Sequence, residues 1–203
     1  MTGSGQLRNF RSRQALRSDQ PFEGGNSVNS TQLTDEPEYG VYRRIMTMMS
    51  SSGTPFRLIH HRPEGRTAEA SEIRGHSLRQ AAKCIVVRTR TAGGLPRHSV
   101  VVVPGDRRVD LEAVTHHVGG DRTTFADRPT AERLTQCRSG SIVPFTFHRD
   151  LELLADPTLL EPEEIFFNAA RLDRSLAVAP ADWAALACPL IRPVAQRDPV
   201  AVG

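Results

Sequence analysis

The sequence predicts a single α+β domain built on a mixed β-sheet flanked by helices. Apolar runs of strand length are interspersed with segments whose apolar residues have helical spacing. The two kinds of segment mix without strict alternation, which favours an α+β fold on a mixed sheet. The length of 203 residues suits one domain with its own core and is short for two.

The first helix and strand are expected just after an N-terminal extension. Residues 1–36 are rich in Gly, Ser, Asn, Gln and Arg and lack apolar periodicity, so we expect a disordered extension. Order is expected from about residue 37. The residues that fall on one helical face there are Val41, Ile45, Met48 and Met49, and Gly53 is a natural stop. A strand is expected at 55–60.

The central elements follow from turn and capping residues. Thr67 is expected to cap a short helix that ends at Gly75. Strands are expected at 84–89 and 99–103. Asp110 should cap a helix that runs to Val118 and is terminated by Gly119.

The remainder is expected to be mostly extended. A helix is expected at 129–136, and extended segments are expected at 142–147, 151–155, 165–169 and 176–179. Pro180, a residue suited to a first turn, should open the last helix. We place the domain at 37–191 and assign 192–203 to a flexible tail.

Composition limits the class of protein. A net charge of +3 permits contact with a polyanion without requiring it. Cys84, Cys137 and Cys188 are odd in number and far apart, so they are interpreted as reduced core cysteines of a cytoplasmic protein. No stretch approaches the ~20 apolar residues of a membrane span, and the N-terminus lacks the apolar core of a secretory signal.

Lysine occurs only once in the chain. The chain has 26 basic residues, of which 25 are arginine and one is lysine, Lys83. Lys83 follows Ala81 and Ala82 and opens an apolar strand. A flexible primary amine places a point charge where a planar guanidinium would not fit. The alternative interpretation is that the sequence has a general bias towards arginine and that its one lysine stands at a random position.

Metal and nucleophile chemistry find little support. The doublets His60-His61 and His116-His117 cannot each chelate one ion, because adjacent side chains diverge on a strand or a helix. No Gly-x-Ser-x-Gly elbow and no Gly-rich phosphate loop is present. We therefore expect neither a metal nor an organic cofactor.

A second signal is the loop that begins at Gly140 and ends at Pro144. Glycine relaxes the backbone at its start, and proline fixes φ and removes a donor at its end. Such a loop can hold backbone amides and carbonyls rigidly against a small polar group. Alone, the spacing is a weak signal.

Several motifs together resemble a known family. They are residues 70–75 (ASEIRG), 82–83 (AK), 110–111 (DL), 140–145 (GSIVPF), 153–157 (LLADP), 167–169 (FNA) and 172–175 (LDRS), within about 40–190. They are similar to the YbaK and prolyl-tRNA-synthetase-associated (aminoacyl-tRNA editing) domain family, in its YeaK-like free-standing branch.

The resemblance implies a partly barrel-like sheet and hydrolysis of the ester that joins a small, wrong amino acid to tRNA. It implies that Lys83 is the essential lysine and that the substrate's ribose hydroxyl helps to orient water. The implied substrate-binding residues are Gly140, Ser141, Ile142, Val143, Pro144, Asn168 and Ser175. Two positions depart from the family pattern: Val143 replaces a proline, and Ser175 stands where synthetase-linked members have histidine.

The partner expected is mischarged aminoacyl-tRNA, and an aminoacyl-tRNA synthetase is a further candidate. Arg74, Arg79 and Arg88 are candidates for the acceptor-stem surface, although solvated side chains are an equal interpretation. Two alternatives stay open. One is a nucleotide- or aminoacyl-tRNA-binding module of the same fold without turnover, and the other is a metal-dependent hydrolase that uses the histidines.

Overall fold

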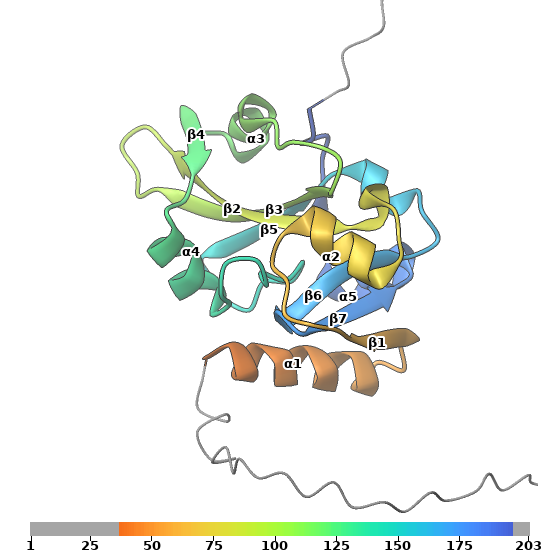
Figure 1. Ribbon diagram of the computed structural model, residues 1–203. Coiled ribbons are helices and arrows are strands. Elements are labelled where there is room, and N and C mark those ends of the chain that lie inside the picture. The colour runs from red at the N-terminus through yellow and green to blue at the C-terminus, as the bar shows by residue number, and fades with distance from the viewer. Residues whose placement is uncertain (1–36, 197–203) are drawn as a thin grey trace, which may run out of the picture.

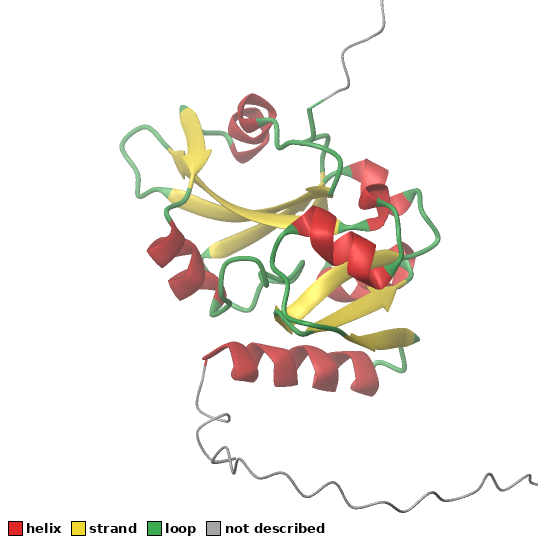
Figure 2. Ribbon diagram, in the orientation of Figure 1, coloured by secondary structure: helices red, strands yellow, loops and turns green. Residues whose placement is uncertain are grey.

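The computed structural model describes residues 37–196, so the expectations for 1–36 and 197–203 lie outside the described residues (Figure 1). The described chain forms two sheets (Figure 2). The smaller has the order β1-β7-β6 and the larger β4-β2-β3-β5-β8. The strands are β1 (Phe56–His60), β2 (Ala82–Arg90), β3 (Arg97–Pro104), β4 (Arg122–Phe125), β5 (Leu151–Ala155), β6 (Ile165–Arg171), β7 (Arg174–Val178) and β8 (Leu190–Ile191).

The α+β class is confirmed, but the single, partly barrel-like sheet is wrong. The smaller sheet is antiparallel, and the larger one is mixed, since β5 runs parallel to β3 and to β8. The two sheets meet at one isolated bridge between Ala81 and Phe166. One bridge does not extend into a ladder, so the strands do not close into a barrel.

Five α-helices surround the sheets within the described residues. They are α1 (Pro37–Ser51), α2 (Thr67–Arg74), α3 (Leu111–Val118), α4 (Arg128–Thr135) and α5 (Pro180–Ala187), with short 3₁₀ turns at Leu78–Gln80 and Pro157–Leu160. Figure 1 shows α1 lying across the three-stranded sheet and α3 over the larger one. None of these helices is both long and apolar enough to cross a membrane.

The first helix has the expected buried face. Val41, Ile45 and Met49 are buried at helical spacing, whereas Met48 is only partly buried. Helix α1 packs against β6. The sequence pattern therefore correctly identified a core helix.

The central parts of β2 and β3 are covered on both faces, which explains their unbroken β-branched runs. Val86 and Val100 face the main core. Val87 and Val101 face a second core beneath α3, which includes Val114. Helix α3 is capped as expected: the Asp110 carboxylate accepts hydrogen bonds from the backbone N–H groups of residues 112 and 113, and Gly119 ends the helix at φ 70°.

The expected Thr67 cap is wrong. Thr67 is the first helical residue, and Arg66 before it makes no side-chain cap. The Glu64 carboxylate instead accepts hydrogen bonds from the backbone N–H groups of Gly65 (3.0 Å) and Arg66 (2.9 Å). The segment leading into α2 is thus fixed by a carboxylate upstream of the helix.

The segment 142–147, expected to be extended, does not form a strand. Val143 and Phe145 are buried, but the segment pairs with no strand of the described chain. The carbonyl of Pro144 accepts a hydrogen bond from Trp183 Nε1 at 2.8 Å instead. Proline supplies no N–H for a ladder, so the loop is held by a side chain.

The flexible tail was expected to begin at residue 192, which is too early. Val194 is fully buried, and the Asp156 carboxylate accepts hydrogen bonds from the backbone N–H groups of Val194 (3.0 Å) and Ala195 (2.8 Å). Residues 192–196 are therefore part of the packed domain.

Candidate active site

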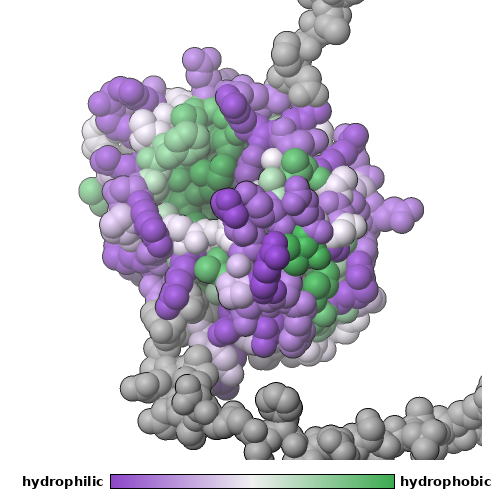
Figure 3. Space-filling view, in the orientation of Figure 1, coloured by the Kyte–Doolittle hydropathy of each residue, from purple (hydrophilic) through white to green (hydrophobic). Residues whose placement is uncertain are grey.

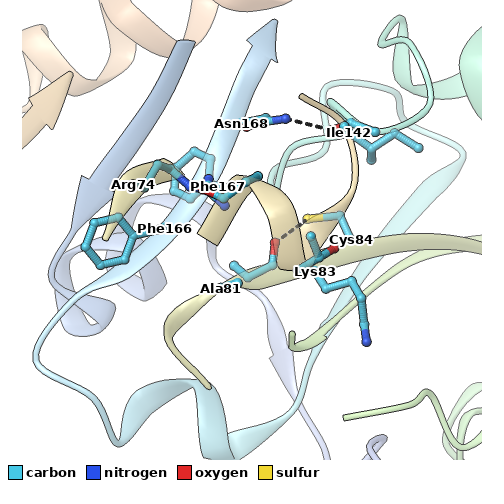
Figure 4. Close-up of a pocket in the computed structure, with 13 residues that line it drawn as sticks. Arg74, Ala81, Lys83, Cys84, Ile142, Phe166, Phe167 and Asn168 are labelled. Carbon is cyan, nitrogen blue, oxygen red and sulfur yellow. Dashed lines mark hydrogen bonds between the residues drawn. The ribbon is translucent and has the colours of Figure 1, made fainter. Parts of the chain in front are cut away.

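A pocket of about 210 Å³ opens where the two sheets meet. Its wall is formed by the start of β2, the middle of β6, helix α2 and the loop that begins at Gly140 (Figure 4). The lining residues are Gly65, Thr67, Ala70, Arg74, Ala81, Ala82, Lys83, Cys84, Gly140, Ile142, Phe166, Phe167 and Asn168. Lys83 and Gly140, far apart in sequence, therefore line one pocket.

Two glycine backbones touch at the base of this pocket. Gly140 has φ +91°, and a Cβ added there would lie 2.7 Å from the Gly65 Cα and 3.0 Å from its carbonyl oxygen. A side chain at residue 140 is excluded both by its backbone conformation and by this contact. The close approach fixes the loop against the entry to α2.

Asn168 joins the same two segments from β6. Its Nδ2 donates hydrogen bonds to the carbonyl of Gly140 at 2.8 Å and to the carbonyl of Glu64 at 2.9 Å. Since both protons of the amide are used, its orientation is fixed. The backbone of the loop at Gly140 is thereby held in one position.

A buried hydroxyl supports Asn168 from β7. Ser175 Oγ donates to Asn168 Oδ1 at 2.9 Å and accepts from Arg74 Nη1 at 3.2 Å. His61 Nε2 lies 2.7 Å from the same Oγ. Burial lowers the pKa of Arg74 to about 10, which leaves its guanidinium charged at neutral pH. Ser175 thus lies behind the pocket wall and acts on it through Asn168.

The Lys83 amine is directed away from the loop in this conformation. Nζ donates to the carbonyl of Gly105 at 3.1 Å and to the carbonyl of Arg107. In Figure 4 the amine points away from Asn168 and Ile142. Burial lowers the pKa of Lys83, although nearby Asp106 opposes the effect.

Lys83 also lines a second, more apolar hollow of about 580 Å³ on the α3 side of the larger sheet, with Ile85, Leu111 and Phe125. Figure 3 shows this hollow as a hydrophobic area between β4 and α3. Lys83 therefore lies between the two cavities and lines both.

The pocket lining of the described chain contains no carboxylate and no imidazole. Cys84 offers no reactive thiolate, because burial raises its pKa well above the usual value. The polar groups available are the Lys83 amine, the Arg74 guanidinium, the Thr67 hydroxyl, the Asn168 amide and backbone atoms. This set can place and polarise a substrate, but it has no general base of its own.

The remaining predicted site residues lie at different depths. Ser141, Val143 and Pro144 do not line the pocket, and Ser141 Oγ donates to the carbonyl of Arg138 at 3.0 Å. Arg74 faces the pocket, which differs from the outer-surface position expected of it. Arg79 is paired with Glu161 on the surface.

Gly65, Glu64 and His61 were missed at the sequence level. The segment Pro63-Glu64-Gly65 by itself indicates only a turn. The need for glycine at residue 65 becomes visible only once Gly140 is placed against it. Among residues 37–196, no group of three His, Cys, Asp or Glu side chains is arranged to hold a metal ion.

His76 makes the stability of the site depend on pH. Its ring stacks on Phe166 at 3.9 Å, its Nε2 is buried without a hydrogen-bond partner, and burial lowers its pKa from 6.5 to about 4. The folded chain then binds fewer protons than the unfolded chain between these values, so stability falls as pH drops from about 6.5 to about 4.

Replacing His76 with phenylalanine keeps the stacking and removes the titration. The free energy of unfolding should fall less on acidification in His76→Phe than in the original chain, by roughly 1–2 kcal/mol. Partial exposure of the ring limits the size of this difference. Urea unfolding at pH 7 and at pH 4.5 measures this. An unchanged difference between the two pH values would contradict it.

Comparison with known proteins agrees with this arrangement. The model of the aminoacyl-tRNA editing domain family matches residues 61–186. The chain is 37% identical over 149 residues to a multifunctional Ser/Thr-tRNA deacylase, ProXp-y, of Escherichia coli strain K12. That alignment covers 73% of this chain and 89% of the relative, and the same protein of strain O157:H7 matches equally well.

Solved structures share the fold. A crystal structure of a hypothetical protein superimposes with a TM-score of 0.68 at 21% identity, covering 75% of this chain and 99% of the other. A putative trans-editing enzyme for prolyl-tRNA synthetase gives 0.65 at 21% identity, covering 77% and 98%. The match of the family model over most of the described residues, together with the 37% identical relative, shows that this chain belongs to the aminoacyl-tRNA editing domain family.

Proposed function

We propose that this chain is a free-standing aminoacyl-tRNA deacylase that hydrolyses the ester of mischarged tRNA carrying a small amino acid. The observation that carries the proposal is the pocket that Lys83 shares with the rigid loop at Gly140. Family membership and the activity named for the E. coli relative support it. In this proposal the chain acts in the cytoplasm, where tRNA is charged, and a synthetase that produces the mischarged tRNA is a candidate partner.

The chemistry requires placement more than activation. An aminoacyl ester is already reactive, so the enzyme needs to orient the ester, a water molecule and a donor for the developing oxyanion. In this proposal Lys83 exchanges the carbonyls of Gly105 and Arg107 for the substrate's terminal phosphate or ester carbonyl. Its flexible stem allows that exchange.

The loop and Asn168 hold the aminoacyl end. Gly140 and Ile142 line the pocket, and Asn168 fixes the Gly140 carbonyl. Because the lining supplies no carboxylate or imidazole, the substrate's own ribose hydroxyl is the group proposed to orient the water. No metal or organic cofactor takes part.

The size of the pocket favours small aminoacyl groups. Its volume of about 210 Å³ is below the roughly 300–1,000 Å³ of typical ligand pockets. Thr67 and Asn168 give it polar character beside Phe167. A seryl, threonyl or alanyl group fits this lining better than a large apolar group.

A panel of mischarged tRNAs tests the proposal. We expect the purified chain to release serine, threonine or alanine from noncognate tRNA, to spare esters of large aromatic amino acids, and to keep its rate in EDTA. Tight binding of these tRNAs without release would favour the binding-module alternative. Loss of turnover in EDTA, restored by a divalent metal, would favour the metal-dependent alternative.

A further inference from the structure

An arginine-lined hollow lies at the far end of β2 from the pocket. Arg88, Arg90, Arg122 and Thr124 line a depression of about 260 Å³, which we call the arginine hollow. All four residues are exposed. Arg90 stands directly opposite Arg122 in the β2–β4 ladder, and Arg88 stands opposite Thr124, so the three arginines share one face of the sheet.

This placement is electrostatically unfavourable for the isolated domain. Like charges directly opposite each other on paired strands destabilise a sheet. None of the three arginines forms an ion pair with residues 37–196, and the exposed Asp121 beside Arg122 is not within ion-pair distance. By contrast, Arg57, Arg97 and Arg128 each pair with a glutamate. The hollow therefore holds concentrated positive charge without a counter-ion from the described chain.

The positive field extends beyond the hollow. His98 stands opposite Arg88 on β3, and its pKa is lowered by burial and then by Arg88 and Arg133. Asp127 opposes the shift but does not overcome it. An anion that approaches this side of the larger sheet thus meets at least four guanidinium groups.

The hollow shares a sheet face with the pocket. Side chains alternate along a strand, so Cys84, which lines the pocket, points to the same side of β2 as Arg88 and Arg90. At about 3.3 Å per residue, Arg88 and Arg90 lie roughly 13 Å and 20 Å from Cys84 along the strand. That span corresponds to roughly four to six nucleotides at about 3.4 Å each.

We infer that the arginine hollow binds the phosphate backbone of the tRNA acceptor stem while the aminoacyl end occupies the pocket. This inference rests on the function proposed above. The spacing places the hollow beyond the unpaired 3′ end, at the first base pairs of the stem. Guanidinium groups suit this role because their planar donors match phosphate oxygens. The contact carries no sequence information and therefore serves tRNAs of different identity.

The test uses a triple variant, Arg88→Gln, Arg90→Gln and Arg122→Gln, and a matched control with the same charge change, Arg57→Gln, Arg128→Gln and Arg149→Gln. Each phosphate contact contributes roughly eightfold to affinity at 0.1 M salt through counterion release. We expect the first variant to bind uncharged tRNA on the order of 500-fold more weakly at 0.1 M salt, with the slope of log affinity against log salt reduced by about 2.7. The control should bind within about threefold of the original chain.

Hydrolysis of a short substrate separates this inference from the proposed function. The triple variant should cleave a seryl ester of a CCA trinucleotide at the original rate and lose kcat/KM only on full-length tRNA. Unchanged tRNA binding by the triple variant, or an equal loss of binding in the control, would overturn the role of the arginine hollow in tRNA binding. The proposed function would still stand if the original chain hydrolysed the substrates. If the original chain hydrolysed neither substrate, the function would fail, and the binding measurements would still decide the hollow.

Stability gives an independent readout. Removing one of two opposed like charges should leave the melting temperature of Arg122→Gln equal to or above that of the original chain. A clear fall in melting temperature would mean that Arg122 serves the fold, which would overturn the inference for that residue.

Discussion

Replacing Lys83 with alanine should reduce kcat/KM for mischarged tRNA by two to three orders of magnitude, with little change in melting temperature. Loss of one charge-assisted contact in a water-poor site costs roughly 2–4 kcal/mol of transition-state stabilisation. Lys83 is only partly buried, and its present partners are carbonyls of two half-buried residues in a turn, so we expect the fold to depend little on it. Single-turnover deacylation and a thermal melt measure the two effects.

Arginine at the same position should fail to restore activity. Ala81 and Ala82 are buried beside Lys83 and leave little room for a guanidinium. Arg108→Ala is the matched control, because Arg108 lines the second hollow with Lys83 but does not line the pocket. Rescue by arginine would reduce Lys83 to an interchangeable charge, and near-normal turnover by Lys83→Ala would refute its role.

Replacing Gly140 with alanine should damage both stability and activity. The new Cβ would meet the Gly65 backbone at 2.7 Å in a conformation of φ +91°. Left-handed strain and overpacking together should cost roughly 3 kcal/mol, which lowers the melting temperature of a domain of this size by about 6–12 °C. Because the loop and the entry to α2 must separate, deacylation should fall at temperatures where the variant is still folded.

Gly93→Ala provides the comparison. Gly93 also has a positive φ, of +67°, but nothing lies within 4 Å of the added Cβ. It should lose only about 1 kcal/mol, and its deacylation rate should not change. Equal losses of stability in the two variants would show that backbone strain, and not contact with Gly65, makes glycine necessary at 140.

Local patterns predicted the elements well. The helix capped at Asp110 and ended by Gly119 was recovered within a residue, because both signals act inside the element itself. Strand β4 was missed because its sequence, Arg-Thr-Thr-Phe, lacks an apolar alternation. It is held by pairing with β2 and by the bond between Thr89 and Thr123 side chains at 2.9 Å.

The candidate site was only partly predictable. The sequence identified Lys83, Gly140 and Asn168, and the structure places all three in one pocket. It could not indicate that Arg74 faces inward, because the contact of Arg74 with Ser175 joins segments 101 residues apart. The support of Asn168 by Ser175 depends on the register of β6 with β7, which the motifs do not specify. The direction of the Lys83 amine depends on its hydrogen bonds to the turn at 105–107. It could not be predicted, because no sequence motif indicated that this turn lies next to Lys83.

The pairing of β1 with β7 determines how the domain can be shortened. The family match begins at residue 61, after α1 and β1, yet β1 covers the outer edge of β7, the strand that carries Ser175. A fragment cut to 61–186 would expose a row of unpaired backbone donors and acceptors on β7, together with the apolar surface that Ile45 and Met49 cover. Such an edge recruits strands from other molecules, so this fragment should aggregate, whereas one that begins at residue 37 should remain monodisperse.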